Sequence, residues 1–175
     1  CFIVEKGFDG FECGKPEEKL GIRSSDTCEL YFDNVKVPKE NMIGSEGEGF
    51  KIALATLDGG RIGIAAQALG IAVSSLNHSI SYSKDRHQFG KPISSNQGIQ
   101  FKLADMSMEI EAARLLIWKA AWAKDNHLNF GVLASMAKVY ASEVAMRAST
   151  QCVQIHGGYG YIKETGVERL MRDAK

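Results

Sequence analysis

The chain has few of the features that direct a protein to a membrane, a nucleic acid or a disulfide scaffold. No apolar run reaches the roughly 18 to 20 residues that a membrane helix needs, and no secretory or transit segment is visible. The 21 basic and 21 acidic residues cancel, so there is no excess charge to attract nucleic acid or a membrane surface. The four cysteines lack both CxxC spacing and disulfide-scaffold density, which indicates reduced thiols in an intracellular protein.

Several common site motifs are missing as well. There is no GxGxxG turn, which excludes a nicotinamide-type domain, and there is no GxSxG elbow or kinase motif set. The four histidines are too scattered for the ligand spacing of a helical metal site, so we expect no metal. The chain opens at Cys1 in strand-like residues without an initiator methionine, and we therefore expect it to be part of a longer protein.

In the residues that are present, strand signals precede helix signals. Residues 2–4 are short, apolar and β-branched, which predicts a buried strand, and partial alternation over 28–33 predicts another. From residue 48 onward apolar residues recur at spacings near three and four, which predicts helices over about 48–85, 97–125, 131–155 and 165–175. Strands followed by helices indicate the α+β class, with a small antiparallel β part and an antiparallel helical bundle.

Two features of the helical half stand out. Gly59 and Gly60 interrupt the first predicted helix at a cost of roughly 1 kcal/mol each relative to alanine, so we expect a close approach to the backbone there. The flanking Asp58 and Arg61 supply polar groups; the alternative is an exposed ion pair at i, i+3 spacing. At roughly 1.5 Å per residue this helix would be about 55 Å long, which favours partner subunits covering its ends.

The connection between the first two predicted helices, residues 82–101, gathers a cation, two amides and an aromatic ring beside the helix breakers Gly90 and Pro92. These candidate residues are Arg86, Gln88, Phe89 and Gln97. An arginine on such a connection can pair bidentately with a phosphate or carboxylate, so the group is typical of a site for a planar anionic ligand. The alternative is a polar loop whose phenylalanine is buried in the core.

A second candidate segment follows the third predicted helix. Successive glycines at 157 and 158 let a ligand approach the chain closely and leave backbone amides accessible, and Gln154 adds a donor and an acceptor. The alternative is a glycine pair that only ends the helix. A dinucleotide carries two phosphate charges, which an arginine and backbone donors can share, so the two segments are expected to bind one ligand.

Four segments of the chain carry a resemblance. They are RHQFGKP at 86–92 with Gln97, CELYFDNVKVP at 28–38, LDGGRIGIAAQALG at 57–70, and QIHGGYGY at 154–161 followed by ERLMRDAK at 168–175. In their order and over nearly the whole chain they resemble the acyl-CoA dehydrogenase family. The resemblance implies that residues 1–44 are the C-terminal part of the middle β domain and that residues 45–175 are the C-terminal helical bundle domain, truncated at its end.

The resemblance also implies roles for the candidate residues. Arg86, Gln88, Phe89 and Gln97 would reach the pyrophosphate of an FAD held largely by a neighbouring subunit. The second segment would contact the adenosine and pyrophosphate region of the same FAD through Gln154, Ile155, His156, Gly157 and Gly158. The turn beside the acyl-CoA tunnel would be Asp58, Gly59, Gly60 and Arg61.

The catalytic base is not among these residues. Dehydrogenation removes a weakly acidic proton α to the thioester carbonyl, which suits a carboxylate whose pKa is raised in a dry pocket. In most of the family this glutamate follows shortly after the RDAK motif, so here it is expected after Lys175. A minority branch places it one residue before the arginine of the substrate turn, where this chain has Gly60.

The expected enzyme oxidises a short-chain acyl-CoA to the trans-2-enoyl-CoA and passes electrons from FAD to an electron-transfer flavoprotein. The resemblance implies a homo-oligomer, a dimer of dimers, in the mitochondrial matrix or the bacterial cytoplasm, without nucleic acid or membrane insertion; residues 1–175 alone are expected to be inactive. Two alternatives remain open: a non-enzymatic helical oligomerisation scaffold, and another flavin enzyme of the same fold such as an acyl-CoA oxidase or a nitroalkane-oxidising enzyme.

Overall fold

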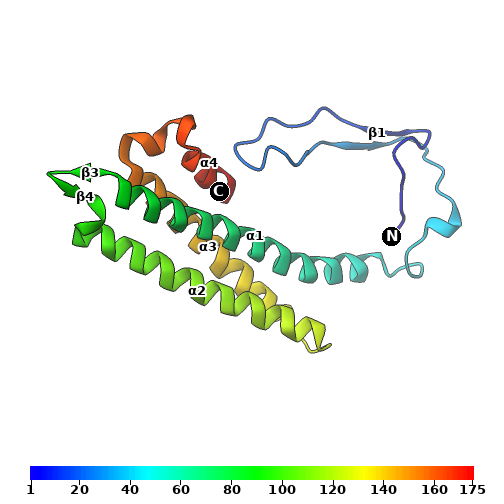
Figure 1. Cartoon of the computed structure of the whole chain (residues 1–175). Helices are drawn as coiled ribbons and strands as arrows, with labels where there is room; N and C mark the ends of the chain where they lie inside the picture. The colour runs from blue at the N-terminus through cyan, green and yellow to red at the C-terminus, as the bar shows by residue number, and fades with distance from the viewer. The chain divides into compact units, whose positions relative to one another are not determined.

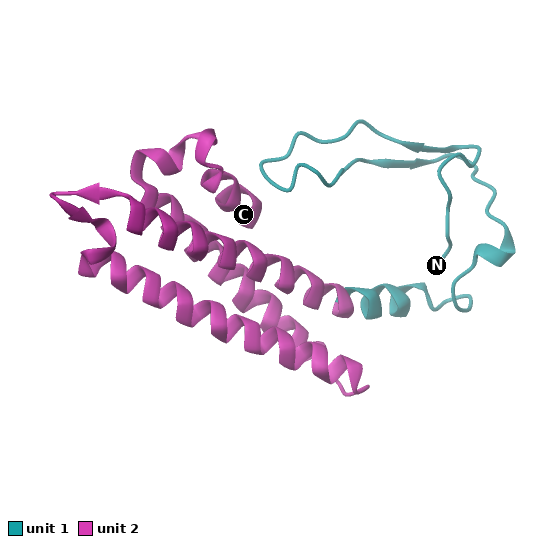
Figure 2. Ribbon diagram, in the orientation of Figure 1, with its two compact units in different colours: residues 1–57 teal, residues 58–175 magenta.

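A computed structural model describes all residues, 1–175. The chain divides into two compact units, Cys1–Leu57 and Asp58–Lys175, with the division inside the long first helix α1, Gly49–Asp85 (Figures 1 and 2). The first unit holds the strands β1, Phe11–Cys13, and β2, Leu30–Phe32, and the second holds most of the helical structure. The structure thus confirms the predicted α+β class.

The first unit is an antiparallel hairpin. β1 pairs with β2 in the register Phe11 to Phe32, and the two rings lie 5.0 Å apart. The prediction of a buried strand at residues 2–4 is wrong. Phe2 forms only an isolated bridge with Met42 and is 56% exposed, and no residue of this unit is buried. Apolar and β-branched residues favour strand conformation. Whether such a strand is buried depends on other segments that cover it, and none covers residues 2–4.

The second unit is an antiparallel bundle. α1 is followed by a short hairpin of β3, His87–Gln88, and β4, Lys91–Pro92, after which α2, Gln97–Asp125, runs back in the opposite direction (Figure 1). α3, Gly131–His156, packs against α2, and the short α4, Val167–Ala174, packs against α3. The helix bounds agree closely with the predicted ones.

Local signals explain these bounds. After α2, His127 adopts a left-handed conformation at φ 55°, its N–H donates to the Lys124 carbonyl at 3.0 Å, and the Leu128 N–H donates to the Ala123 carbonyl at 2.9 Å. This pair of bonds is a Schellman motif, which satisfies carbonyls that the helix end would leave free. α3 ends at Gly157, whose φ of 57° a side chain would oppose.

The core of the bundle is built from small residues. Its buried alanines are Ala65, Ala68, Ala72, Ala113, Ala120, Ala137, Ala141, Ala145 and Ala148. Three serines on α1 are also buried, and each hydroxyl donates to a carbonyl of its own helix: Ser75 to Ile71, Ser79 to Ser75 and Ser83 to Ile80. Because the polar groups are satisfied locally and the side chains are short, the helix axes can approach closely.

Many of the larger apolar residues lie outside this core. The exposed ones on the three long helices include Leu54, Leu57, Ile64, Phe101, Met108, Leu115, Trp118, Trp122, Val132, Met136 and Val139. Trp118 and Trp122, one helical turn apart on α2, are each 60% exposed. The spacing of apolar residues predicted the helices correctly. The face that each long helix buries, however, carries mainly alanine and not the larger apolar residues.

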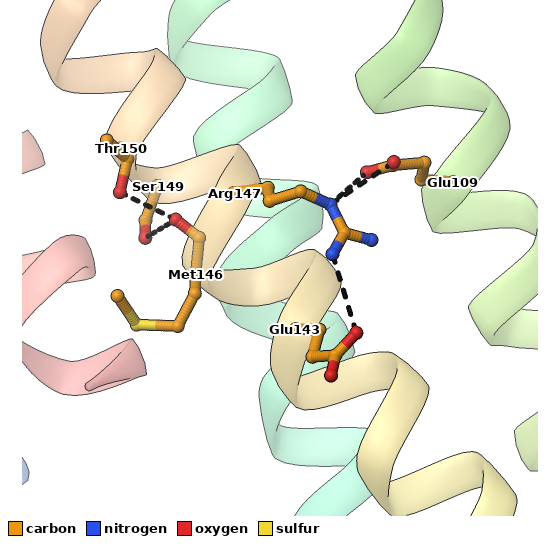
Figure 3. A network of polar contacts seen from close by, with 6 residues as sticks. All are labelled: Glu109, Glu143, Met146, Arg147, Ser149 and Thr150. Carbon is orange, nitrogen blue, oxygen red and sulfur yellow. Dashed lines mark hydrogen bonds and ion pairs between the residues drawn. The ribbon is translucent and has the colours of Figure 1, made fainter.

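A polar network also ties α2 to α3 (Figure 3). The Arg147 Nε lies 3.1 Å from Glu109 Oε2 on α2, and its Nη1 lies 3.6 Å from Glu143 Oε2 on its own helix. The hydrogen bond with Glu109 raises the pKa of Arg147. Since these groups are partly exposed, the ion pair between α2 and α3 contributes only modestly to stability.

Enlarging a core alanine is expected to destabilise the bundle. Ala113 is fully buried, so Ala113→Leu must displace its neighbours and should lower the free energy of unfolding by about 1 to 3 kcal/mol. Ala104→Leu, at an exposed position of the same helix, is the control and should change it by less than about 0.5 kcal/mol. Urea titration followed by circular dichroism measures both, and equal effects would show that Ala113 is not tightly packed.

Candidate functional site

A cavity of about 440 Å³ lies where α1 ends, beside the end of α3 and the turn that follows it. Its lining residues are Tyr82, Arg86, Gln88, Ile93, Ile155, His156, Gly157, Gly158, Tyr159 and Ile162. The volume is within the usual range for a small-molecule site. Two segments separated by about a third of the chain therefore meet at one hollow.

Arg86 gives the cavity its charge. Its backbone N–H donates to the Tyr82 carbonyl at 2.8 Å, and its carbonyl accepts from the Ile93 N–H at 2.9 Å, so both backbone groups are held in place. The guanidinium lies over the Tyr159 ring, 5.8 Å from its centroid. No carboxylate lines the cavity, so its positive charge is uncompensated there and favours an anion.

The glycine turn supplies room. A Cβ added to Gly157 or Gly158 would meet no atom within 4 Å, so the space in front of both is open. The Gly157 N–H donates to the Gln154 carbonyl and closes α3, so this amide is not free for a ligand, contrary to expectation. Gly160 differs, because a Cβ there would lie 2.4 Å from the Val153 carbonyl oxygen, and only glycine allows this tight turn.

His156 forms the buried wall of the cavity and is 6% exposed. Its ring stacks on Tyr82 of α1 with centroids 4.2 Å apart, and its Nδ1 donates to the Cys152 carbonyl at 2.8 Å. Burial lowers the pKa of the imidazole, an effect that the hydrogen bond to Cys152 partly offsets. The ring is therefore held neutral with its proton on Nδ1.

The structure brings together six of the nine residues expected to bind the cofactor: Arg86, Gln88, Ile155, His156, Gly157 and Gly158. The other three, Phe89, Gln97 and Gln154, do not line the cavity. Phe89 is 97% exposed at the tip of the β3–β4 hairpin with φ 52°, which also excludes the alternative of a phenylalanine buried in the core.

Four lining residues were missed by the sequence analysis: Tyr82, Ile93, Tyr159 and Ile162. Tyr82 stands one helical turn before Arg86, so its spacing was a usable signal for a shared face. Tyr159 lies within the QIHGGYGY segment, and its aromatic ring was a usable signal for a flat partner of the arginine. The two isoleucines carry no signal beyond their apolar character.

The expected substrate turn lies elsewhere on α1. Arg61 and Asp58 form an ion pair within the helix, and α1 continues without interruption through Gly59 and Gly60. The Lys124 side chain approaches Gly59, and its Nζ would lie 3.2 Å from a Cβ added there, while Gly60 faces open space. Arg61 and Arg86 are 25 positions apart, about 37 Å along the helix, so they serve different parts of the surface.

Neither metal nor membrane features accompany the cavity. No group of three or more histidine, cysteine, aspartate or glutamate side chains is arranged to hold a metal ion. None of the helices combines the length and the hydropathy that a membrane span requires.

An antiparallel bundle with an anion-attracting cavity at one end has the architecture of a ligand-binding helical domain. The family model described as the C-terminal domain of acyl-CoA dehydrogenases matches residues 47–175. The chain therefore belongs to the acyl-CoA dehydrogenase family.

Curated relatives agree with this family. The short-chain specific acyl-CoA dehydrogenase of Megasphaera elsdenii is 60% identical over 174 residues, which cover 99% of this chain and 45% of the relative. The mitochondrial short-chain specific acyl-CoA dehydrogenase of Rattus norvegicus is 52% identical over 174 residues, which cover 99% and 42%. The chain thus spans less than half the length of these two relatives.

Solved structures also match nearly all of this chain and less than half of the other chain. Butyryl-CoA dehydrogenase from Megasphaera elsdenii matches with a TM-score of 0.97 and 60% identity over 99% of this chain and 45% of the other. A structure described as an electron transferring flavoprotein of Acidaminococcus fermentans matches with a TM-score of 0.97 and 55% identity over 99% and 46%. PigA with FAD and proline matches with a TM-score of 0.94 and 27% identity over 99% and 45%.

The buried imidazole is expected to make stability depend on pH. Because its pKa is lowered on folding from an ordinary value of 6.5, the unfolded chain binds a proton that the folded chain does not. The stabilisation is complete above that value and is lost as the pH falls below it, so the free energy of unfolding should rise with pH across this interval. Urea titrations between about pH 5 and pH 7.5 measure the slope.

His156→Gln should remove this part of the slope, while His127→Gln serves as the control at an exposed position. A slope that His156→Gln leaves unchanged would contradict the assignment to this ring.

Proposed function

We propose that the chain is part of an FAD-dependent acyl-CoA dehydrogenase that oxidises a short-chain acyl-CoA to the trans-2-enoyl-CoA. The observation that carries this proposal is the cavity in which the uncompensated Arg86 faces the open glycine turn at 157–158. The names of the relatives from Megasphaera elsdenii and rat support the short-chain preference. The same names favour a dehydrogenase over a scaffold without activity.

The cavity fits a flavin dinucleotide by charge and by space. Arg86 would pair with the diphosphate, Gln88 would offer an amide, and the absent side chains of Gly157 and Gly158 would let the dinucleotide lie close to the chain. When bound, FAD supplies the acceptor for the hydride from the β carbon. A match to a solved structure that contains FAD supports the choice of cofactor.

The substrate turn and the base complete the proposal. The Asp58 and Arg61 pair would contact the acyl-CoA, with Gly59 and Gly60 leaving room beside it. The carboxylate that removes the α proton stays a prediction for a position after Lys175, since Gly60 offers no side chain. Oxidation by oxygen, as in an acyl-CoA oxidase, would be recognised by rapid reaction of the reduced flavin with oxygen.

Partners and compartment belong to the same proposal. An electron-transfer flavoprotein would accept the electrons, in keeping with the match to a structure described as one. Bacterial and mitochondrial relatives support the bacterial cytoplasm or the mitochondrial matrix. The homo-oligomer, a dimer of dimers, is part of the same proposal. The chain supports self-association through exposed apolar residues on α2 at intervals of seven: Phe101, Met108, Leu115 and Trp122, here named the α2 stripe.

Arg86→Ala in the flavin-loaded protein should weaken FAD retention about tenfold or more, since a charged hydrogen-bonding partner of the diphosphate is lost. Flavin absorbance after dialysis gives the retained fraction, and butyryl-CoA turnover with a dye acceptor gives the activity. Arg114→Ala is the matched control, because Arg114 pairs with Glu111 on its own helix and does not line the cavity. Full retention by Arg86→Ala would remove the arginine from the flavin site.

Leu115→Glu should break the oligomer by placing a charge in the middle of the α2 stripe, without unfolding a position that is exposed in the single chain. Light scattering after size-exclusion chromatography measures the mass, and circular dichroism checks the helices. Ser107→Glu puts the same charge on the same helix beside the stripe and is the control. An unchanged mass for Leu115→Glu would show that the stripe is not an interface.

A further inference from the structure

Two of the four cysteines lie on the β1–β2 hairpin. Cys13 is the last residue of β1 and pairs with Leu30 of β2, and Cys28 stands two residues before Leu30. The Gly14 N–H donates to the Glu29 carbonyl at 2.8 Å, so the pairing of the two strands reaches the residue next to Cys28. Side chains two residues apart on a strand point to the same face, so the two cysteines are diagonal neighbours on one face of the hairpin.

The strand pairing is irregular beside Cys28. Beyond Glu29, the next backbone bond runs from the Glu17 N–H to the Thr27 carbonyl at 2.8 Å. Residues 15–16 therefore stand opposite Cys28 alone, which is the two-to-one count of a β-bulge, and the second of them is a proline without an N–H. No backbone hydrogen bond holds Cys28 itself, so its side chain can move toward β1 without breaking the ladder.

The two thiols also influence each other. Burial raises the pKa of the Cys28 thiol, and the Cys13 thiol raises that pKa further through its charge and through a hydrogen bond between the two side chains. Cys13 is exposed and Cys28 is half-buried, so a dissolved oxidant reaches Cys13 first. Neither cysteine belongs to a group that is arranged to hold a metal ion. The pair is therefore available to react as two thiols.

We propose that Cys13 and Cys28 are a redox-sensitive pair that hydrogen peroxide converts to a reversible disulfide. The Cys13 thiolate attacks one peroxide oxygen, the O–O bond breaks, and the sulfur becomes a sulfenic acid while water leaves. The Cys28 thiolate then attacks that sulfur, the S–S bond forms, and the sulfenic oxygen leaves as a second water. Two thiols are oxidised, one peroxide is reduced, and both thiol protons end in water. A dithiol restores the cysteines by exchange.

The disulfide ties together the two ends of the loop formed by residues 14–27. No residue of the first unit is buried, and a two-stranded hairpin without a core is only marginally stable, so the reduced loop can open. Trypsin can cut this loop after Lys19 and Arg23, but both side chains donate to loop carbonyls, so the cuts require opening. A bond across the strands restricts the open forms and should therefore slow this cleavage. This inference goes beyond the proposed function and does not depend on it.

The test uses the full-length protein, first reduced and then treated with an equimolar amount of hydrogen peroxide. Free thiols are blocked with iodoacetamide, and tryptic peptides of the unfolded protein are analysed by mass spectrometry with and without a dithiol. Oxidation should join peptide 7–19, which contains Cys13, to peptide 24–36, which contains Cys28, and the dithiol should separate them. In the folded protein, tryptic cleavage after Lys19 should slow about tenfold on oxidation.

Cys28→Ser should stop the reaction at the sulfenic acid, so labelling of Cys13 by dimedone should rise about fivefold or more above the wild type. Cys1→Ser removes a thiol outside the hairpin and is the control, which should leave the joined peptides unchanged. A wild type without the joined peptides, or with Cys13 joined to another cysteine, would overturn the inference. Equal dimedone labelling in the wild type and in Cys28→Ser would also overturn it, because Cys28 would then not be the thiol that resolves the sulfenic acid.

Discussion

The packing of the alanine-bearing faces of α1, α2 and α3 into one core is the constraint on which the rest of the structure depends. Short side chains leave little free volume between the helices, and buried serines on α1 add no unsatisfied group because each donates to its own helix. This packing lets Tyr82 of α1 stack on His156 of α3, and both residues line the cavity. The cavity is thus a product of helix packing as much as of the motifs on either side.

Most of the fold could be predicted because its boundaries are encoded locally. Gly157 ends α3, residues 126–128 end α2, and the breakers around Gly90 separate α1 from α2. Coverage of an apolar face is a different matter, since it depends on what lies opposite. Residues 2–4 have a strand composition without a covering layer, and the tryptophans of α2 have helical spacing on the face turned away from the bundle.

The sequence predicted some residues of the candidate site and missed others. Arg86 and His156 come from motifs that identify their segments, and packing brings these segments together. Phe89 belongs to the same motif as Arg86, but the hairpin turn places it on the outside, at a positive φ that a bulky residue adopts only when its surroundings impose it. Tyr82 belongs to no motif; its spacing of one helical turn from Arg86 indicated a shared face, and the structure shows that it lines the cavity.

The outward position of the bulky apolar residues bears on how such a protein is made in a cell. A newly synthesised chain exposes these large apolar side chains until another surface covers them. During that interval it is a substrate for chaperones and proteases. Where assembly supplies the cover, its rate rises with subunit concentration, so the fraction of chains that escape degradation rises with expression level. A cell that halves synthesis would then lose more than half of the mature protein.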